Sequence, residues 1–163
     1  MYTIDEVAEK LDKYAEIYSI LFSTSESIRI KLLLSPLYNF RDALAHYRKL
    51  YKASDPDEKL SQTTSIIEHL NRGLKDGCYF ILLKVKIGVD YELKNVHHNS
   101  SEKTRKLRTI LHRYKSLELA LRGPEMIDLN TIINCINNLV PLIQETKALF
   151  QQHGLEWDFS KNK

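Results

Sequence analysis

The fold is decided by the stretch from Asp55 to Leu93, which reads DPDEKLSQTTSIIEHLNRGLKDGCYFILLKVKIGVDYEL. Asp55 can cap a helix, Pro56 suits the first helical position, and acids there favour the positive end of the helix. After this start, apolar residues recur at helical spacing, and they are Leu60, Ile67, Leu70, Leu74, Cys78, Ile81 and Val85. Gly73 and Gly77 lie on one side and can let a neighbouring helix approach closely. One long helix is therefore predicted.

Two more helices are predicted before this stretch. Thr3 and Glu6 form a capping box, and the apolar spacing after it predicts a helix up to about residue 22. A second helical region follows over residues 28–51, and Pro36 is expected to kink or divide it. Its inward stripe is predicted from apolar residues at helical spacing, which are Leu37, Phe40, Leu44 and Tyr47.

Two further helices are predicted after residue 93. Ser100 or Ser101 can cap the first of them, and the pair Gly123-Pro124 stops it. Asp128 can cap the last helix, in which a bend is expected near Pro141.

The sum of these elements is an all-α fold. With 163 residues the chain has the usual length of one domain, and 5 Gly and 4 Pro are too few for a strand-and-turn architecture. Residues 1–163 are expected to form one antiparallel bundle of about five helices joined by short turns. The tail over residues 154–163 is expected to pack on it through Trp157 and Phe159.

Composition excludes several classes of function. No stretch approaches the roughly 18 apolar residues of a membrane span, and the N-terminal segment is acidic, so we expect no membrane association and a cytoplasmic location. Cys78 and Cys135 stand in apolar helical stretches without metal-ligand spacing, and we interpret both as buried thiols. No cofactor and no metal is expected, because no Walker loop, zinc motif, diiron pair or EF-hand loop occurs.

The residues that can carry chemistry stand in the second helical region, in the sequence Arg41-Asp42-Ala-Leu-Ala-His46. At 100° per residue, Arg41, Asp42 and His46 fall across the face opposite the predicted inward stripe. That face combines a cation, an acid and an imidazole, which are groups that stabilise charge and move protons.

This motif resembles the hallmark of the HEPN superfamily of helical nucleotide-binding and RNA-cleaving domains. The hallmark is an Arg, four to six residues and a His, often with Asn, Asp or His directly after the Arg. The resemblance implies a homodimer in which two motifs meet and cleave RNA without a metal, through attack of a ribose 2'-hydroxyl on the adjacent phosphate. It also implies a toxin or defence setting, with an antitoxin or regulator as a protein partner.

The resemblance also assigns roles to the three residues. His46 would move or position a proton, Arg41 would hold the phosphate and stabilise its developing charge, and Asp42 would orient Arg41. Arg105 and His112 fit the spacing too, with six residues between them. Lys106 follows Arg105, where the family has Asn, Asp or His, and this favours the first match.

Further residues are candidates for binding RNA phosphates. His69 and Arg72 can face the motif if the helices over residues 28–51 and 56–93 pack as a hairpin, and surface salt bridges are the alternative reading. The basic helix after residue 100 offers four more candidates, Arg105, Arg108, His112 and Arg113. A solvated face or an acidic protein partner explains these four equally well. The alternative function is therefore a non-catalytic helical module that binds or regulates another protein.

Overall fold

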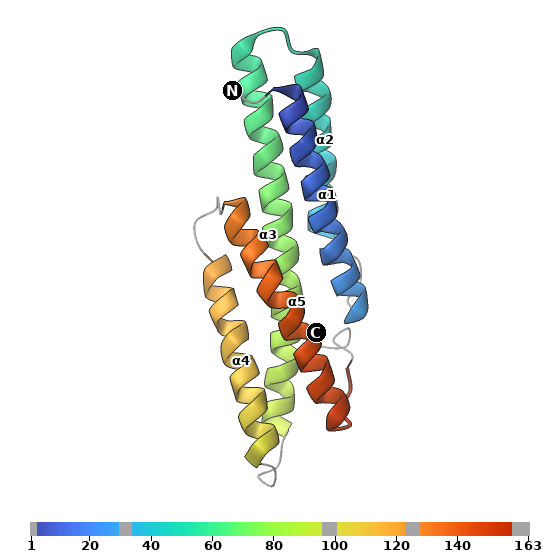
Figure 1. Cartoon of the computed structure of the whole chain (residues 1–163), viewed down its shortest axis with the longest axis vertical. Coiled ribbons are helices and arrows are strands. Elements are labelled where there is room, and N and C mark those ends of the chain that lie inside the picture. Colours follow the sequence, from blue (N-terminus) through green and yellow to red (C-terminus); the bar gives the residue numbers. More distant parts are fainter. Residues whose placement is uncertain (1–2, 30–33, 96–100, 123–127, 158–163) are drawn as a thin grey trace.

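The computed structural model describes residues 3–29, 34–95, 101–122 and 128–157. Within these ranges the chain forms five helices and no strand (Figure 1). The helices are α1 (Ile4–Ser27), α2 (Leu34–Lys52), α3 (Pro56–Asn95), α4 (Ser101–Leu121) and α5 (Leu129–Gln152). The predicted all-α bundle is confirmed.

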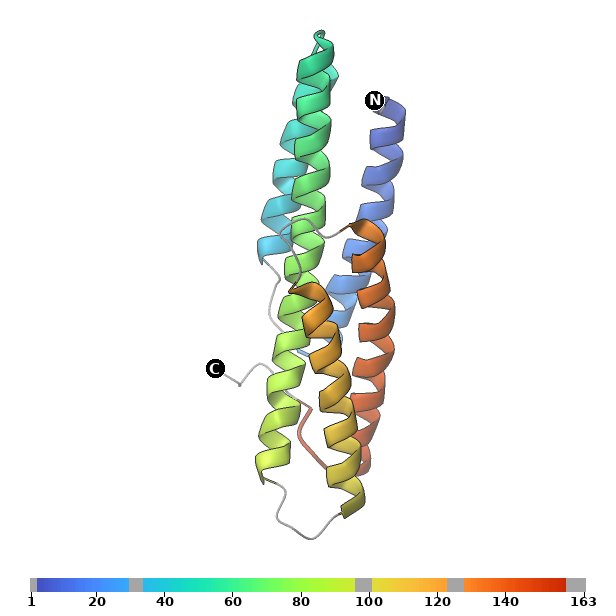
Figure 2. The same cartoon turned by 90° about the vertical axis from the view of Figure 1, so that its left-hand side faces the viewer.

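Helix α3 is the axis of the molecule. Its first half packs against α1 and α2, and its second half packs against α4 and α5 (Figure 1). In the view turned by 90°, α2 lies along the upper part of α3, while α1 and α5 lie on the other side (Figure 2). A helix of 40 residues is roughly 60 Å long, so the bundle is elongated.

The core follows α3 along its length. The inward residues of α3 are fully buried, and they include Ile66, Leu70, Leu74, Cys78, Ile81, Leu82, Val85 and Val89. Tyr14 of α1, Tyr114 of α4 and Phe150 of α5 are the largest side chains packed into this core. Cys78 and Cys135 are both buried free thiols, as predicted. From Leu70 to Val85 the spacing that predicts the long helix also predicts its buried face, whereas Leu60 near the start of the helix is 50% exposed.

The helix ends follow the predicted caps. Thr3 and Glu6 form the capping box of α1, the Asp55 carboxylate accepts the N–H of Glu58 at 2.9 Å, and Asp128 caps α5. Helix α1 extends to Ser27, beyond the predicted end near residue 22. The hydroxyl groups near its end donate to carbonyls three or four residues back, so they are satisfied within the helix; the donors are Ser23, Thr24, Ser25 and Ser27.

The structure corrects two predictions for α2. Pro36 does not divide the helix, because Leu34–Lys52 is one helix with Pro36 in its first turn. A proline there lacks only an N–H that has no partner within the helix. The expected inward stripe is only half right: Phe40 and Tyr47 are partly buried against the core, whereas Leu37 is 37% and Leu44 is 45% exposed. The buried residues of α2 are instead Pro36, Ala43 and Leu50. The small Ala43 side chain lets α2 lie close to the core at the edge of the bundle.

At Gly73 the three helices α1, α2 and α3 approach one another closely. A Cβ atom built on Gly73 would lie 1.9 Å from the Tyr18 hydroxyl of α1 and 2.9 Å from Cβ of Asn39 in α2. No side chain fits there, so a glycine is required by packing rather than by backbone conformation.

The C-terminal tail packs onto the bundle through Trp157. Its indole N–H donates to the carbonyl of Ser27 at 3.2 Å, and its ring meets Phe150 edge-on with 5.5 Å between centroids. The prediction is confirmed for Trp157, while Phe159, Ser100 and the Gly123-Pro124 pair lie outside the described residues.

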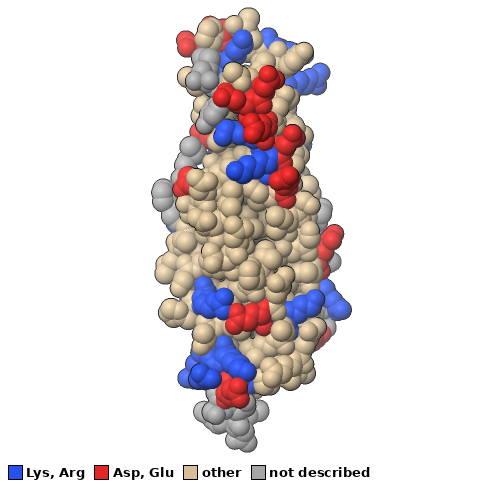
Figure 3. Space-filling view, in the orientation of Figure 1, with Lys and Arg blue, Asp and Glu red and all other residues tan. Residues whose placement is uncertain are grey.

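Charge is unevenly placed on the surface. Figure 3 shows one face whose charged side chains gather in its upper and lower parts and leave the middle uncharged. In the sequence of α5, residues 129–144 include no Lys, Arg, Asp or Glu. Even so, each helix within the described ranges is too short or too polar to cross a membrane.

Candidate active site at the α2–α3 seam

Helices α2 and α3 form an antiparallel hairpin joined by residues 53–55, and polar side chains face each other along it. On α2 the spacing of three and four residues brings one polar group per turn toward α3. On α3 the matching groups stand seven residues apart. We call this set the polar seam, and its members are Ser35, Asn39, Asp42 and His46 of α2 with Gln62, His69 and Asp76 of α3.

Two histidines stack at the centre of the polar seam. The rings of His46 and His69 have centroids 5.3 Å apart and planes 23° from parallel. Nδ1 of His46 lies 2.8 Å from Oε1 of Gln62, and Nδ1 of His69 lies 3.3 Å from Oδ1 of Asn39. Among the described residues, Nε2 of neither ring has a hydrogen-bond partner. The two Nε2 atoms are therefore available to a substrate.

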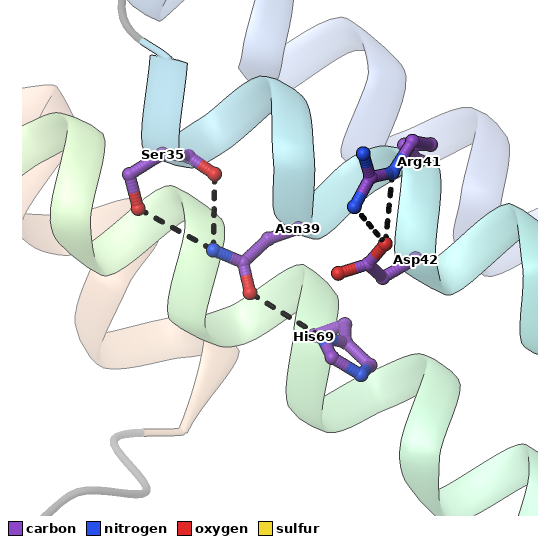
Figure 4. A network of polar contacts seen from close by, with 5 residues as sticks. All are labelled: Ser35, Asn39, Arg41, Asp42 and His69. Atoms are coloured by element: carbon purple, nitrogen blue, oxygen red, sulfur yellow. Dashed lines mark hydrogen bonds and ion pairs between the residues drawn. The ribbon is translucent and has the colours of Figure 1, made fainter.

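Hydrogen bonds continue from His69 along the polar seam. Nδ2 of Asn39 donates to the carbonyl of Ser35 at 3.0 Å and lies 3.4 Å from its hydroxyl oxygen (Figure 4). The Ser35 hydroxyl donates to Oδ2 of Asp76 at 2.7 Å. The contacts cross from α3 to α2 and back, so they also fix the register of the hairpin.

Arg41 and Asp42 form an exposed pair beside the histidines. Both Nε and Nη2 of Arg41 donate to Oδ1 of Asp42, at 2.9 and 2.7 Å (Figure 4). The Arg41 guanidinium also lies 5.3 Å from the ring centroid of Tyr38. The bond from Arg41 holds the pKa of Asp42 below its usual value, and the nearby His69 and His46 act in the same direction. Because the Arg41 side chain is 69% exposed, it can reach a phosphate.

The surroundings of His69 favour its neutral form. Burial is the largest cause that lowers its pKa below the usual value, followed by the charge of His46. Arg72 lowers this pKa as well, while Asp42 and Glu68 act against the shift. A neutral imidazole at neutral pH is the form that accepts a proton.

The other candidates for phosphate binding divide into two groups. Arg72 is exposed one turn after His69 on α3, close enough to affect its charge state. The candidates on α4 are also exposed, and they are Arg105, Arg108, His112 and Arg113. Among the described residues α4 does not pack against α2, and Arg113 pairs with Glu145 of α5. The cations of α4 therefore form a separate surface and not one wall of a cleft with Arg41.

Sequence reasoning missed Ser35, Asn39 and Gln62, whereas Asp76 stands in the polar group around His69 and Arg72 that was expected to face the motif. The signal was present in their spacing, because Asn39 precedes Asp42 by three residues and His46 by seven, which places all three on one helix face. Gln62 and Asp76 stand seven residues before and after His69. Polar side chains repeated at this spacing indicate a polar interface between two helices.

The seam leads into a groove but contains no clustered metal ligands. Ser35 and Asp76 line one end of a groove of about 460 Å³, whose other walls are mostly apolar, from Leu34, Pro36, Tyr79, Phe80 and Leu83. Within the ranges that the structure describes, no three His, Cys, Asp or Glu side chains gather so as to hold a metal ion.

The fold and the seam define a class only, an all-α bundle with a surface pair of histidines beside an arginine. Comparison of the chain with family models, with curated proteins and with solved structures gave no match. Function is therefore argued from the geometry of the seam and from the motif that the sequence carries.

Proposed function

We propose that this chain is a HEPN-like helical domain that cuts RNA without a metal at the polar seam. The observation that supports the proposal is the stack of His46 and His69 beside the pair of Arg41 and Asp42. An acid, a base and a cation within reach of one another are the groups that transfer of a phosphoryl group needs.

Arg41 suits the role of the phosphate-binding cation. Its planar guanidinium can offer two parallel N–H groups to two phosphate oxygens, and Asp42 holds it in one orientation until the substrate arrives. Arg72 adds positive charge on the neighbouring helix. His46, which is near enough to Asp42 to lower its pKa, would then exchange a proton with an oxygen of the bound phosphodiester.

The proposal includes a homodimer, and the outer face of α2 supports it. Large hydrophobic residues on this face are exposed and alternate with Arg41 and Arg48; they are Leu34, Leu37, Leu44 and Tyr51. A second copy on this face would cover the hydrophobic residues and bring two copies of Arg41 close to one phosphate. Pairing of this kind also explains how one chain with few catalytic groups can stabilise the charge of a transition state.

Cleavage assays test the proposal. Purified protein is incubated in EDTA with cellular RNA and synthetic single strands, and the wild type is compared with Arg41→Ala and His46→Ala. We expect cleavage by the wild type and a loss of about 10²-fold or more in both variants, because each removes a charge or a proton donor. Circular dichroism and thermal melting show that the variants are folded.

The chain offers a matched control for this assay. Arg105 and His112 have the same residue types at a similar spacing on α4, where they are exposed and distant from the polar seam. Arg105→Ala and His112→Ala should therefore retain wild-type cleavage. No cleavage by the wild type on any substrate, or an equal loss in both pairs of variants, would contradict the proposed function.

The exposed face of α2 also favours a second candidate, a non-catalytic module whose α2 binds a helix of another protein. Because Arg41 and Arg48 alternate with leucines there, the partner helix would carry acids between apolar residues. Three results together would establish this second candidate. The protein cleaves no RNA, it stays monomeric at high concentration, and it binds a synthetic leucine- and glutamate-rich helix through this face.

A further inference from the structure

We propose that His69 is a second catalytic residue of the polar seam and that its Nε2 takes the proton of the attacking 2'-hydroxyl. Asn39 acts as the positioning residue that keeps this Nε2 free. The proposal rests on the proposed function and adds to it a role that the Arg41 and His46 motif does not include. Its evidence is the direction of the hydrogen bonds along the polar seam.

The amide of Asn39 has only one orientation that satisfies its neighbours. Its contact with the Ser35 main chain is to a carbonyl oxygen, which can only accept, so the Asn39 atom that meets it must be the NH₂ group. The amide oxygen then points to His69 (Figure 4). An oxygen without a hydrogen cannot donate, so Nδ1 of His69 carries the proton. In a neutral ring Nε2 is then left with a lone pair.

The hydrogen bonds from His69 to Asp76 all run in one direction. Nδ1–H of His69 donates to Oδ1 of Asn39, Nδ2–H of Asn39 donates to the Ser35 hydroxyl oxygen at 3.4 Å, and that hydroxyl donates to the carboxylate of Asp76. Bonds aligned in this way polarise one another. The positive charge that forms on His69 when Nε2 takes a proton is therefore stabilised by a carboxylate that does not touch the substrate.

The charged groups around His69 agree with this role. From α2 it faces His46 and Asp42, and from α3 it faces Arg72 and Glu68. Burial, His46 and Arg72 lower its pKa more than the two acids raise it. The ring therefore enters the reaction neutral at neutral pH, as a general base must.

The proposed step balances without any further reactant. As the 2'-oxygen forms its bond to phosphorus, its proton passes to Nε2 of His69. The bond from phosphorus to the 5'-oxygen breaks, and that oxygen takes a proton from Nε2 of His46. His46 must therefore be protonated when this step begins. The products are a 2',3'-cyclic phosphate and a 5'-hydroxyl end, and exchange with water restores both histidines.

Cleavage as a function of pH tests the proposal on wild type, His69→Ala, Asn39→Asp and the control Lys94→Ala, whose exposed side chain pairs with Asp90 near the end of α3. We expect His69→Ala to lose about 10²-fold or more in kcat, and Lys94→Ala to match the wild type. Asn39→Asp retains an oxygen that accepts from Nδ1 but adds a negative charge. Its rate should therefore decline at a higher pH than the wild type as the solution is acidified, a shift that a purely structural role of Asn39 would not cause.

Nitrogen NMR of the histidine rings provides a readout that does not depend on activity. We expect the neutral form of His69 to be the Nδ1–H tautomer in the wild type and in Asn39→Asp, and a mixture of tautomers in Asn39→Ala. An Nε2–H tautomer in the wild type would overturn the proposal.

The cleavage results separate the two proposals. A wild type that cleaves RNA while His69→Ala stays within about 3-fold of it would overturn the role of His69 and leave the proposed function standing. Absence of cleavage by the wild type would overturn both. If His69→Ala fails to fold, an unshifted pH profile in Asn39→Asp still decides against the proposal.

Discussion

Glu118 of α4 is the only charged residue that is buried among those the structure describes. Its side chain is 7% exposed and accepts from Nζ of Lys86 at 2.5 Å and from Nη2 of Arg122 at 2.6 Å. The bond from Lys86 is the main reason that the pKa of Glu118 is lowered. Lys86 is itself only 20% exposed, so each charge of the pair depends on the other.

Removal of this carboxylate should therefore destabilise the fold strongly. We expect Glu118→Ala to lower the free energy of unfolding by about 3–5 kcal/mol, because it leaves the Lys86 ammonium without its partner in a largely buried position. Urea unfolding followed by circular dichroism measures the change. The control is Glu102→Ala, which removes the exposed ion pair with Lys106 and should leave the unfolding midpoint almost unchanged. Equal effects of the two substitutions would refute this account of the buried pair.

Gly73 matters at the scale of whole helices, because its missing side chain sets how closely α1 and α2 approach α3. We expect Gly73→Ala to destabilise the protein by roughly 1–3 kcal/mol, since the new methyl group meets the Tyr18 hydroxyl and Asn39. The higher helix propensity of alanine offsets part of this cost, by about 1 kcal/mol. Thermal and urea unfolding measure the net effect.

A double variant tests whether the clash is the cause. Tyr18→Phe removes the hydroxyl oxygen that lies 1.9 Å from the added carbon, so Tyr18→Phe with Gly73→Ala should regain part of the lost stability. The contact with Asn39 persists in the double variant. If the two substitutions simply add, close approach at Gly73 is not what limits stability.

The accuracy of sequence-based prediction differs between single helices and pairs of helices. Caps and apolar spacing are local, so the start of α3 at Pro56 and the capping of α5 by Asp128 could be predicted. The rotation of α2 could not, because Leu37 and Leu44 have the same periodicity as Ala43 and Leu50. Which of these faces is buried depends on where α1 and α3 lie.

For the candidate site too, features within one helix can be predicted from the sequence, while contacts between helices cannot. The motif of Arg41, Asp42 and His46 stands within one turn and a half of one helix, so the sequence alone identifies it. The register of the hairpin decides that Asn39 meets His69 and that Gln62 meets His46. Short-range spacing in the sequence does not determine this register. Polar partners between helices are therefore the part that needs a structure.

At the scale of the whole molecule, the outer face of α2 determines the expected assembly. We expect the wild type to sediment as a dimer at micromolar concentration and Leu44→Glu to sediment as a monomer, because the added carboxylate would be buried against its symmetry mate. If two motifs must meet for cleavage, Leu44→Glu should also lose ribonuclease activity.

The matched control places the same charge on a different surface. Leu119 of α4 is 71% exposed, and Leu119→Glu should leave both the dimer and the cleavage unchanged. A wild type that sediments as a monomer at every concentration tested, or a Leu44→Glu variant that remains dimeric, would show that α2 is not the interface.

The polar seam takes all its residues from a single short stretch of the chain. Every group of the polar seam stands in one continuous segment, residues 35–76, and α4 and α5 pack against the opposite end of α3. Substitutions on the exposed faces of the last two helices therefore change none of the residues that form the hydrogen bonds of the hairpin. The contacts of the polar seam are carried by one short stretch of chain, which makes the hairpin the natural unit to graft onto another helical scaffold.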